Sequence, residues 1–307
     1  MRSLLVTANP AAAEVGRVLT RLSSTELPLL LEGETGCGKS LLAAKMHRRS
    51  RPGRPLVVVD CGAVPASLAA AELFGHASGA FTDATRARQG WLEQAGDGTV
   101  VLDRVETLPS EAQIALLRAV EERRFVPLGG AAARPLRARI LATATADVAA
   151  CLEDGRLRRD LYHRLAGFHA RIPPLRLRPE DILPASLAFL RRQGRRMRAA
   201  LTLDPECQEV LRAYPWPGNF RELESALTRA CLTADGGVIR PHHLSLAPRS
   251  WPAVAAWAAE QRRSLAEVTR LYGLWVLAGE RGNVSRAARV LGVSRRTLIR
   301  WRAQPHG

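Results

Sequence analysis

An eight-residue motif constrains the fold of this chain more than any other feature of its sequence. The motif, GETGCGKS at residues 33–40, fits G-x-x-x-x-G-K-[ST] and stands between an apolar run and a helical pattern. Glycines in such a loop let backbone N–H groups surround phosphate oxygens, and the following helix N-terminus adds positive potential. A chance match is the alternative, but the strand–loop–helix context argues against it. The sequence therefore predicts a phosphate-binding loop at the end of a buried strand.

The loop has a defined ligand chemistry. We expect Lys39 to reach the β- and γ-phosphates of ATP and the Ser40 hydroxyl to bind Mg²⁺. An oxidisable thiol at Cys37 is one interpretation, but a small residue that fits a tight loop is the simpler one. The residues expected to contact the nucleotide in this loop are Gly33, Glu34, Thr35, Gly36, Cys37, Gly38, Lys39 and Ser40.

The rest of the first half of the chain alternates between strands and helices. Near-continuous apolar runs of strand length occupy residues 27–33, 56–62, 98–105 and 137–144, as in strands buried on both faces of a parallel sheet. Helical periodicity lies between them, for example over 109–123. This alternation predicts an α/β fold with a doubly wound parallel sheet flanked by helices.

The alternation stops near Pro173, and from Pro179 to about Leu232 we expect only helical segments. The chain of 307 residues is long enough for about two domains at ~100–200 residues each. The expected organisation is an α/β nucleotide-binding subdomain over 1–173, a helical subdomain over 174–245, a linker over 246–263 and a small helical module over 264–307.

The charge of the chain favours an anionic partner. Its net charge is +16, from 45 Lys+Arg against 29 Asp+Glu, and the only lysines are Lys39 and Lys45. Nucleic acid is the first expectation and an acidic membrane surface the second, while arginine usage that reflects genome composition is the alternative to both. No apolar run approaches the ~20 residues of a membrane span, and the N-terminus does not resemble a signal peptide. Five scattered cysteines without a C-x-x-C pair argue against zinc or disulfides and favour a reducing cytoplasm.

A second nucleotide element is the apolar strand that ends at Asp103, a carboxylate placed to order the Mg²⁺ shell. In an ATPase of this architecture a glutamate normally follows and polarises the attacking water. Here that position is Arg104, which cannot act as a base because guanidinium does not deprotonate at working pH. Glu106 is the alternative base, two residues further on. Impaired hydrolysis is the simpler expectation.

The C-terminal module has the pattern of two short helices joined by a turn. Apolar residues at 284, 287, 288 and 291 form one buried face, Asn283 caps the start, Gly292 makes the turn and Ser294 caps the next helix. In a helix-turn-helix the second helix enters the major groove, where arginine reads guanine and other basic residues contact phosphate. Leu298 and Trp301 are expected to pack inside, and a solvated basic face is the alternative. The predicted DNA contacts are Arg295, Arg296, Thr297 and Arg300.

With these residues in hand, the chain resembles the AAA+ domain of bacterial enhancer-binding proteins, the activators that work with sigma-54 RNA polymerase. The resemblance covers roughly residues 1–245, and GNVSRAARVLGVSRRTLIRW near the C-terminus is similar to the Fis-type helix-turn-helix of these activators. It implies an AAA+ P-loop sheet, an all-helical lid, and ATP and Mg²⁺ as cofactors. Seven motifs carry it in order: GETGCGKS, AELFGHASGAFTDA, GWLEQAGDGTVVLD, LLRAVEERRFVPLGG, GRLRRDLYHRL, IPPLRLRPEDI and YPWPGNFREL.

The resemblance also implies roles for single residues. Arg158 and Arg164 match arginines that reach the γ-phosphate of a neighbouring subunit, so the site would be complete only in a ring, typically a hexamer. Arg221 matches a lid arginine that senses nucleotide, while Phe81 and Thr82 match a loop tip pressed against the sigma factor. The chain is similar to stand-alone members without an N-terminal regulatory domain, which a partner protein or the expression level controls.

Four departures from the family pattern concern hydrolysis or its coupling to sigma-54. Asp83 stands where the family has a loop glycine, and Thr145 stands where it has an asparagine that senses the γ-phosphate. Arg104 replaces the catalytic glutamate, and Asp60 replaces the asparagine that holds this glutamate. Ser40, in contrast, fits the general P-loop better than the glutamate common in the family. If the family geometry holds, Asp60 and Arg104 face each other. An ion pair that locks this element and independent drift in a disused site are the two interpretations.

Three classes of function follow. The first is ATP-driven activation of sigma-54 polymerase from upstream promoter sites. The second is a binding module that takes ATP, assembles and binds DNA but hydrolyses poorly, and acts with an active paralogue or with another polymerase form. The third is a remodelling ATPase or helicase unrelated to transcription, which would need neither the GAFT loop (GAFTDA here) nor the helix-turn-helix.

Overall fold

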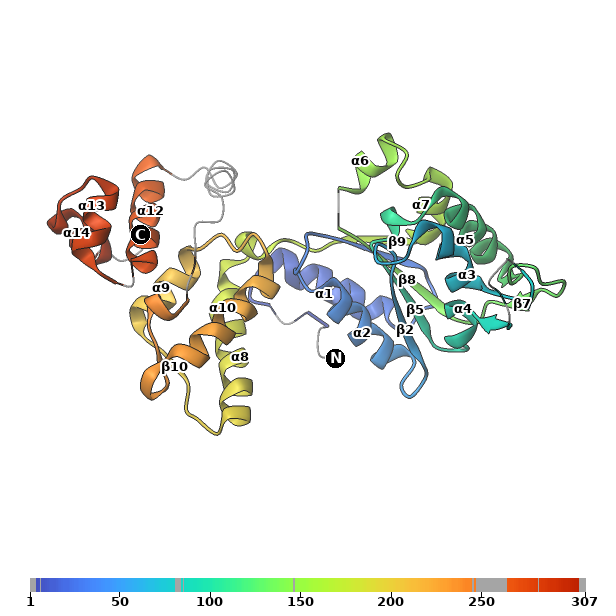
Figure 1. The fold of residues 1–307 in the computed structure, drawn as a ribbon, viewed down its shortest axis with the longest axis horizontal. Helices are drawn as coiled ribbons and strands as arrows, with labels where there is room; N and C mark the ends of the chain where they lie inside the picture. Colours follow the sequence, from blue (N-terminus) through green and yellow to red (C-terminus); the bar gives the residue numbers. More distant parts are fainter. Residues whose placement is uncertain are drawn as a thin grey trace. The chain divides into compact units, whose positions relative to one another are not determined.

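The structure of the chain is a computed structural model that describes residues 4–5, 7–80, 84, 86–145, 147–244, 246, 264–280 and 282–303. The chain divides into two compact units, Met1–Pro173 and Pro174–Gly307. Figure 1 shows a sheet with helices in the first unit and mainly helices in the second, where the structure adds one very short strand pair. The α/β sheet, the lid and the C-terminal module of the predicted fold are all present.

The first unit is organised around one five-stranded parallel sheet. Its strands lie in the order β2-β5-β8-β1-β9, so each pair of neighbours needs a crossover connection. The four strands expected from the apolar runs are confirmed, and a fifth, β9, was not predicted. The strands are β1 (Leu29–Glu32), β2 (Leu56–Asp60), β5 (Thr99–Asp103), β8 (Arg139–Ala144) and β9 (Phe168–Arg171).

Alternate strand residues pack against helices on the two faces of this sheet. Leu30, Leu102 and Ala142 belong to one core cluster, whereas their neighbours Leu31 and Val101 belong to another. The first cluster takes in residues of α3 (Ala69–Phe74), α4 (Trp91–Gln94), α5 (Ser110–Glu122), α6 (Val148–Glu153) and α7 (Arg159–Leu165). The second takes in residues of α1 (Pro10–Leu22) and α2 (Lys39–Ser50). Helices on both faces explain why the strands are apolar along their whole length.

Two short antiparallel pairs lie outside this sheet in the first unit. They join β3 (Gly75–His76) to β4 (Arg88–Gln89), and β6 (Arg124–Phe125) to β7 (Arg134–Pro135). The loop between β3 and β4 includes residues 81–83, which lie outside the described residues.

The second unit begins with a helical lid. Its main helices are α8 (Ile182–Met197), α9 (Pro205–Ala213) and α10 (Asn219–Thr233), packed around the fully buried Trp216, whose Nε1 donates to Leu211 O at 2.8 Å. The expectation of helical segments alone needs one correction. Two-residue strands β10 (Thr202–Leu203) and β11 (Val238–Ile239) form a parallel pair, because the chain returns beside the end of α8.

Within its described residues, the C-terminal module contains three helices, α12 (Leu265–Gly279), α13 (Val284–Leu291) and α14 (Arg295–Ala303). Its small core includes Leu277, Ala287, Ala288 and Leu298. The expected caps are confirmed, since Asn283 Oδ1 accepts from Arg286 N–H at 3.0 Å and Ser294 Oγ accepts from Thr297 N–H at 3.0 Å. Of the expected linker 246–263, only Leu246 is described, and it is buried in the lid core.

No helix in the described part of the chain is both long and apolar enough to cross a membrane. All five cysteines are free and buried, the most exposed being Cys231 at 5%. Burial raises the pKa of the Cys61 and Cys207 thiols to about 12, so their reactive thiolate form is scarce at neutral pH.

We therefore expect the native protein to react slowly with a thiol reagent. At neutral pH without denaturant, close to zero thiols should be titrated within minutes, and all five in denaturant. Fast modification of one thiol in the native protein would contradict the buried state of the cysteines. A Cys37→Ser variant then shows whether the loop cysteine is the reactive one.

Candidate functional site

The strand ends of the sheet bring the predicted nucleotide residues to one edge. Because all five strands are parallel, their carboxyl ends share that edge. From one side of the sheet to the middle, β2 ends at Asp60, β5 at Asp103 with Arg104 next, and β8 is followed by Thr145. The phosphate-binding loop comes after β1, the next strand along. Asp60 and Asp103 are direct partners in the register of β2 and β5.

The loop at residues 33–40 has the conformation that its sequence predicts. Gly38 has φ of +102°, a conformation that side chains with a Cβ rarely adopt, and no atom would obstruct a ligand where its Cβ would point. Lys39 begins α2, and its Nζ donates to Gly33 O at 2.6 Å and to Glu34 O at 3.0 Å across the loop. The ammonium therefore lies over the loop backbone, where phosphate would be cradled. Cys37 is 2% exposed in the apolar core, which favours the small-residue interpretation.

The oxygen donors beside the loop suit Mg²⁺. Ser40 is exposed in the first turn of α2, and Asp103 is half-buried at the end of β5. A hydroxyl and one carboxylate match an ion that binds few protein oxygens and takes the rest from water and nucleotide phosphates. No group of three or more His, Cys, Asp or Glu side chains gathers as a metal cage within the described ranges.

Thr143 positions Asp103, and sequence reasoning missed it. Its buried hydroxyl donates to Asp103 Oδ1 and accepts the Arg104 backbone N–H at 3.2 Å. The Thr143 side chain thus positions both the Asp103 carboxylate and the backbone N–H of Arg104. The available signal was a hydroxyl residue near the end of an otherwise apolar strand.

Arg104 and Asp60 form the ion pair that the sequence suggested. Arg104 Nε lies 3.0 Å from Asp60 Oδ1, and Nη2 contacts the same oxygen. The hydrogen bond to Asp60 raises the pKa of the guanidinium, so Arg104 stays charged. The pair is half-exposed, with side-chain exposures of 39% for Arg104 and 49% for Asp60. In the family pattern that the sequence resembles, these two positions hold an asparagine and a glutamate.

Two backbone features hold this pair in place. Arg104 has φ of +60°, a left-handed conformation that is uncommon for a residue with a Cβ. Its guanidinium lies against Gly62, where an added Cβ would be only 2.6 Å from Arg104 Cζ. The flat stacking of the guanidinium therefore depends on a glycine two residues after Asp60.

Glu106, the alternative base, is turned into the protein. It lies in η2 (Val105–Thr107), is 6% exposed, and its Oε1 accepts the Thr145 N–H at 2.8 Å. The Glu106 carboxylate thus ties η2 to the end of β8. This geometry supports a structural role for Glu106 and leaves the position after Asp103 with a cation.

The remaining nucleotide-related arginines differ in their surroundings. Arg158 precedes α7 and pairs with Asp160, with Nη2–Oδ2 at 2.7 Å and Nε–Oδ1 at 3.1 Å. Arg164 is exposed on α7 and has no ion pair among the residues that the structure describes. Arg221 is exposed on α10 in the second unit. The predicted sigma-factor contacts Phe81 and Thr82 lie outside the described residues.

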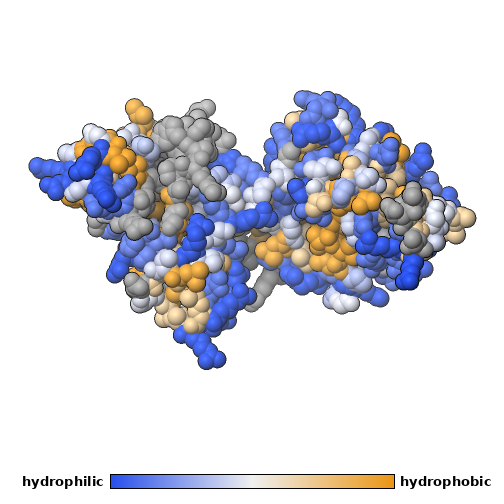
Figure 2. Space-filling model, viewed as in Figure 1, coloured by the Kyte–Doolittle hydropathy of each residue, from blue (hydrophilic) through white to orange (hydrophobic). Residues whose placement is uncertain are grey.

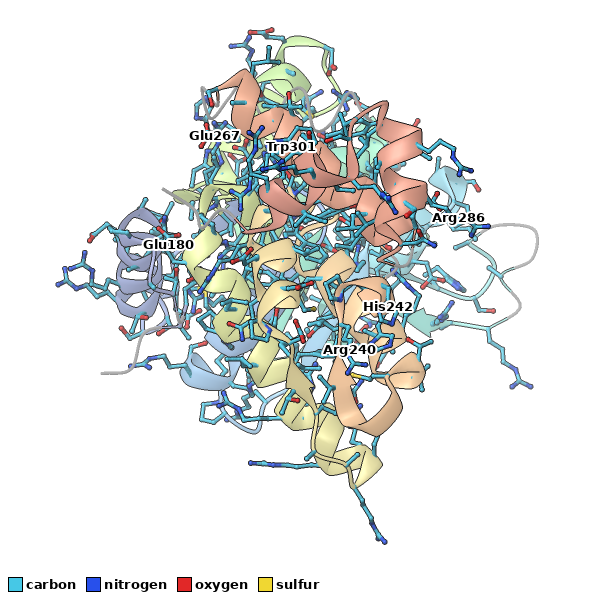
Figure 3. All side chains as sticks on the ribbon, turned by 90° about the vertical axis from the view of Figure 1, so that its left-hand side faces the viewer. Glu180, Arg240, His242, Glu267, Arg286 and Trp301 are labelled. Carbon is cyan, nitrogen blue, oxygen red and sulfur yellow. The ribbon has the colours of Figure 1, made fainter. Side chains whose placement is uncertain are left out.

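Helix α14 presents the predicted DNA-reading face. Arg295, Arg296 and Arg300 are exposed, whereas the Thr297 hydroxyl bonds to Ser294 Oγ at 2.8 Å and thereby takes part in the cap. Leu298 is fully buried and Trp301 packs against Gly273 of α12, as expected for residues that hold the helix in place. Figure 3 labels Trp301 among the helices of this module and Arg286 of α13 at its outer surface.

Ile299 is a further candidate on this face that sequence reasoning missed. It is 52% exposed and follows Arg295 and Arg296 by four and three residues, so it shares their side of the helix. An exposed apolar side chain on a recognition helix can contact a thymine methyl group. The signal was an isoleucine outside the buried 298/301 face.

The chain matches three protein families in order along its length. Residues 5–171 match the sigma-54 interaction domain, 176–254 the AAA+ ATPase lid domain, and 276–302 the bacterial regulatory protein Fis family. These ranges contain the loop at 33–40, the lid helices and all but the last residue of α14, respectively.

Individual relatives agree with these families. The response regulator protein FleR of Pseudomonas aeruginosa is 40% identical over 250 residues, which are 80% of this chain and 53% of FleR. The regulatory protein AtoC of Escherichia coli is 35% identical over 313 residues, with 99% of this chain and 68% of AtoC covered. The chain thus spans about half to two thirds of the length of these relatives. The crystal structure of Brucella abortus NtrX in complex with ADP is similar, with a TM-score of 0.73 and 26% identity over 96% of this chain and 68% of NtrX.

Proposed function

Because the chain belongs to the family of sigma-54-dependent transcriptional regulators, we propose that it binds ATP with Mg²⁺, assembles into a ring and acts on sigma-54 RNA polymerase from upstream promoter DNA. The observation that carries the nucleotide part is the loop at 33–40 with Lys39 over its backbone. Lys39 and the loop N–H groups would hold the phosphates, and Ser40 and Asp103 would hold Mg²⁺. When bound, Mg²⁺ would neutralise part of the negative charge of the ATP phosphates.

Ring assembly is proposed from two arginines at α7 of the first unit, the half-buried Arg158 and the exposed Arg164. Arg158 and Arg164 would reach the nucleotide of a neighbouring subunit, in a ring that is typically hexameric. Arg158 would have to exchange Asp160 for phosphate on assembly, whereas Arg164 is already available. A ring of identical subunits and a mixed ring with a paralogue both fit this use. With promoter DNA and RNA polymerase as partners, the protein would act in the cytoplasm. A regulatory partner protein is a further proposed element of control.

A second candidate function is that of a subunit that binds ATP and DNA but hydrolyses ATP poorly. The observation that favours it is the Arg104–Asp60 ion pair, together with the engagement of Glu106 by Thr145. A guanidinium cannot accept a proton from the attacking water. Such a subunit would act with an active paralogue or regulate another polymerase form.

Nucleotide binding and turnover by the purified protein separate the two candidates. Turnover together with nucleotide-dependent binding of sigma-54 supports activation, while tight binding without turnover supports the second function. Size-exclusion chromatography with and without ATP tests the ring. Failure to bind nucleotide at all would sink both.

The two lysines of the chain give a matched pair for this test. Lys39→Ala should lower ATP affinity by roughly 10- to 150-fold, because hydrogen bonds to a charged group contribute about 1.5–3 kcal/mol. Lys45→Ala, on the same helix, should leave it nearly unchanged, since Lys45 Nζ donates to Leu4 O at 3.2 Å. Titration of a fluorescent ATP analogue measures both. Equal losses in the two variants would argue against the role of Lys39.

A further inference from the structure

The end of helix α8 carries an unusual concentration of positive charge. Five arginines lie within residues 191–198, and no aspartate or glutamate occurs between 182 and 203. Arg195 and Arg196 lie in the last turn, where cations complement the helix dipole. Arg198 is the C-cap of the same helix end, but the dipole does not account for Arg191 and Arg192, which lie before the last turn. Figure 2 shows hydrophilic (blue) surface over the lower tip of this unit, where α8 ends in Figure 1.

These arginines form two stripes with different surroundings. On one stripe, Arg192 pairs with Glu224 of α10 at 2.9 Å and lies over the ring of Phe189. On the other, Arg191, Arg195 and Arg198 follow one another at i, i+4 and i+7 and are exposed. None of these three guanidinium groups makes an ion pair or hydrogen bond with any residue that the structure describes. The stripe of Arg191, Arg195 and Arg198 is thus unneutralised, whereas on the other stripe Arg192 is neutralised within the lid.

The unneutralised stripe surrounds a hollow. Arg191, Arg195 and Arg198 line it together with Leu190, Gly194 and Leu201, and its volume is about 420 Å³. The chain turns back at this point, since Ala199 N–H donates to Gly194 O at 3.0 Å. Arg198 makes the turn in a left-handed conformation, with φ of +53°, where glycine or asparagine is usual. The turn therefore brings a third cation to the hollow in a conformation that arginine disfavours.

We propose that this hollow binds the phosphodiester backbone of DNA as a second contact, separate from α14. Guanidinium groups bind phosphate through paired hydrogen bonds, and an anion between three like charges relieves their mutual repulsion. At ~1.5 Å rise per residue the stripe spans roughly 10 Å, which corresponds to about three base-pair steps along the DNA axis at ~3.4 Å of axial rise per phosphate of one strand. This inference rests on the proposed DNA binding of the chain.

The test compares two double variants of the full chain with equal charge. Arg191→Gln with Arg195→Gln removes two groups from the hollow, and Arg192→Gln with Arg196→Gln removes two from the neighbouring stripe. Binding of a labelled duplex is measured over a range of salt concentrations. The hollow variant should lower the slope of log K against log salt by about 2 and weaken binding roughly 10-fold or more near ~0.1 M salt. The control should change the slope by less than about 1.

Further variants separate the outcomes. Arg191→Lys with Arg195→Lys retains the charge and should retain most of the slope, which distinguishes lost contacts from misfolding. Equal slopes in the hollow and control variants would overturn the proposal. Binding of inorganic triphosphate that depends on the hollow, with an unchanged DNA slope, would also overturn it in favour of a small phosphate ligand. Arg296→Gln changes α14 alone. If it weakens DNA binding while the hollow variant leaves the salt slope unchanged, α14 binds DNA and the hollow does not. If the hollow variant lowers the salt slope while Arg296→Gln has no effect, the hollow binds DNA and the role proposed for α14 fails.

Discussion

Replacing the Arg104–Asp60 pair by an acid and an amide should raise ATP turnover by roughly 100-fold or more over the parent, the usual contribution of a positioned general base. The variant is Arg104→Glu with Asp60→Asn. It exchanges the guanidinium hydrogen-bonded to Asp60 Oδ1 for a carboxylate beside Asp103. Steady-state phosphate release from the purified protein measures the change, with nucleotide affinity measured in parallel.

The double change is needed because each single change leaves an unbalanced charge. Arg104→Glu alone sets a second carboxylate against Asp60, which raises the pKa of one of the two acids. Asp60→Asn alone leaves Arg104 without its partner and still provides no base. Only the double variant places a carboxylate at position 104 and, at position 60, an amide that can hold this carboxylate by a hydrogen bond and release it.

A matched control isolates the carboxylate. Asp60→Asn with Arg104→Gln removes the ion pair equally but adds no base, so its turnover should stay near that of the parent. Gly62→Ala is an independent probe, since the added Cβ would lie 2.6 Å from Arg104 Cζ and displace the guanidinium without altering either charge. If the acid–amide variant turns ATP over no faster than the parent while binding it normally, the ion pair is not what limits hydrolysis.

The sequence was sufficient to predict the sheet because its strands are buried on both faces. Continuous apolar runs identified β1, β2, β5 and β8, and the motif at 33–40 predicts which end of the sheet would bind the nucleotide. Strand β9 was not predicted because its sequence, Phe-His-Ala-Arg, is not a continuous apolar run. Its His169 and Arg171 side chains contact a residue far away in the sequence, Glu32 of β1. His169 Nε2 lies 2.8 Å from Glu32 Oε2, and Arg171 Nη2 lies 2.8 Å from Glu32 Oε1. An edge strand with such partners has no apolar run to reveal it.

Contacts between distant segments also decide what single residues do. Asn219 and Glu222 have the spacing of a capping box, and Glu222 does accept the Gly218 N–H at 2.8 Å. Asn219 Oδ1, however, accepts from Leu175 N–H, 44 residues earlier, and the helix is capped at Gly218. Thr143 and Gly62 were missed for the same reason. Their importance comes from which side chain approaches them in three dimensions.

The recognition helix gives the second large effect. Arg295→Ala or Arg296→Ala should weaken binding to the preferred duplex by roughly 5- to 150-fold, since a bidentate arginine–guanine contact contributes about 1–3 kcal/mol of discrimination. The preferred duplex is first selected from a random library with the purified chain. Both side chains are exposed on the first turn of α14, so neither change should unfold the module.

The pattern of loss identifies what each residue contacts. A base contact lowers affinity for the selected duplex and relaxes the preference at one base pair, whereas a phosphate contact weakens all duplexes alike and lowers the salt slope by about 1. Ile299→Ala should reduce a preference for thymine at one position with little change in salt slope, because a methyl contact carries no charge. Arg286→Ala on α13 is the control for a general loss of charge, being exposed but outside α14. If Arg295→Ala, Arg296→Ala and Arg286→Ala are equivalent on every duplex, α14 does not read bases, and the exposed arginines serve only as a charged surface.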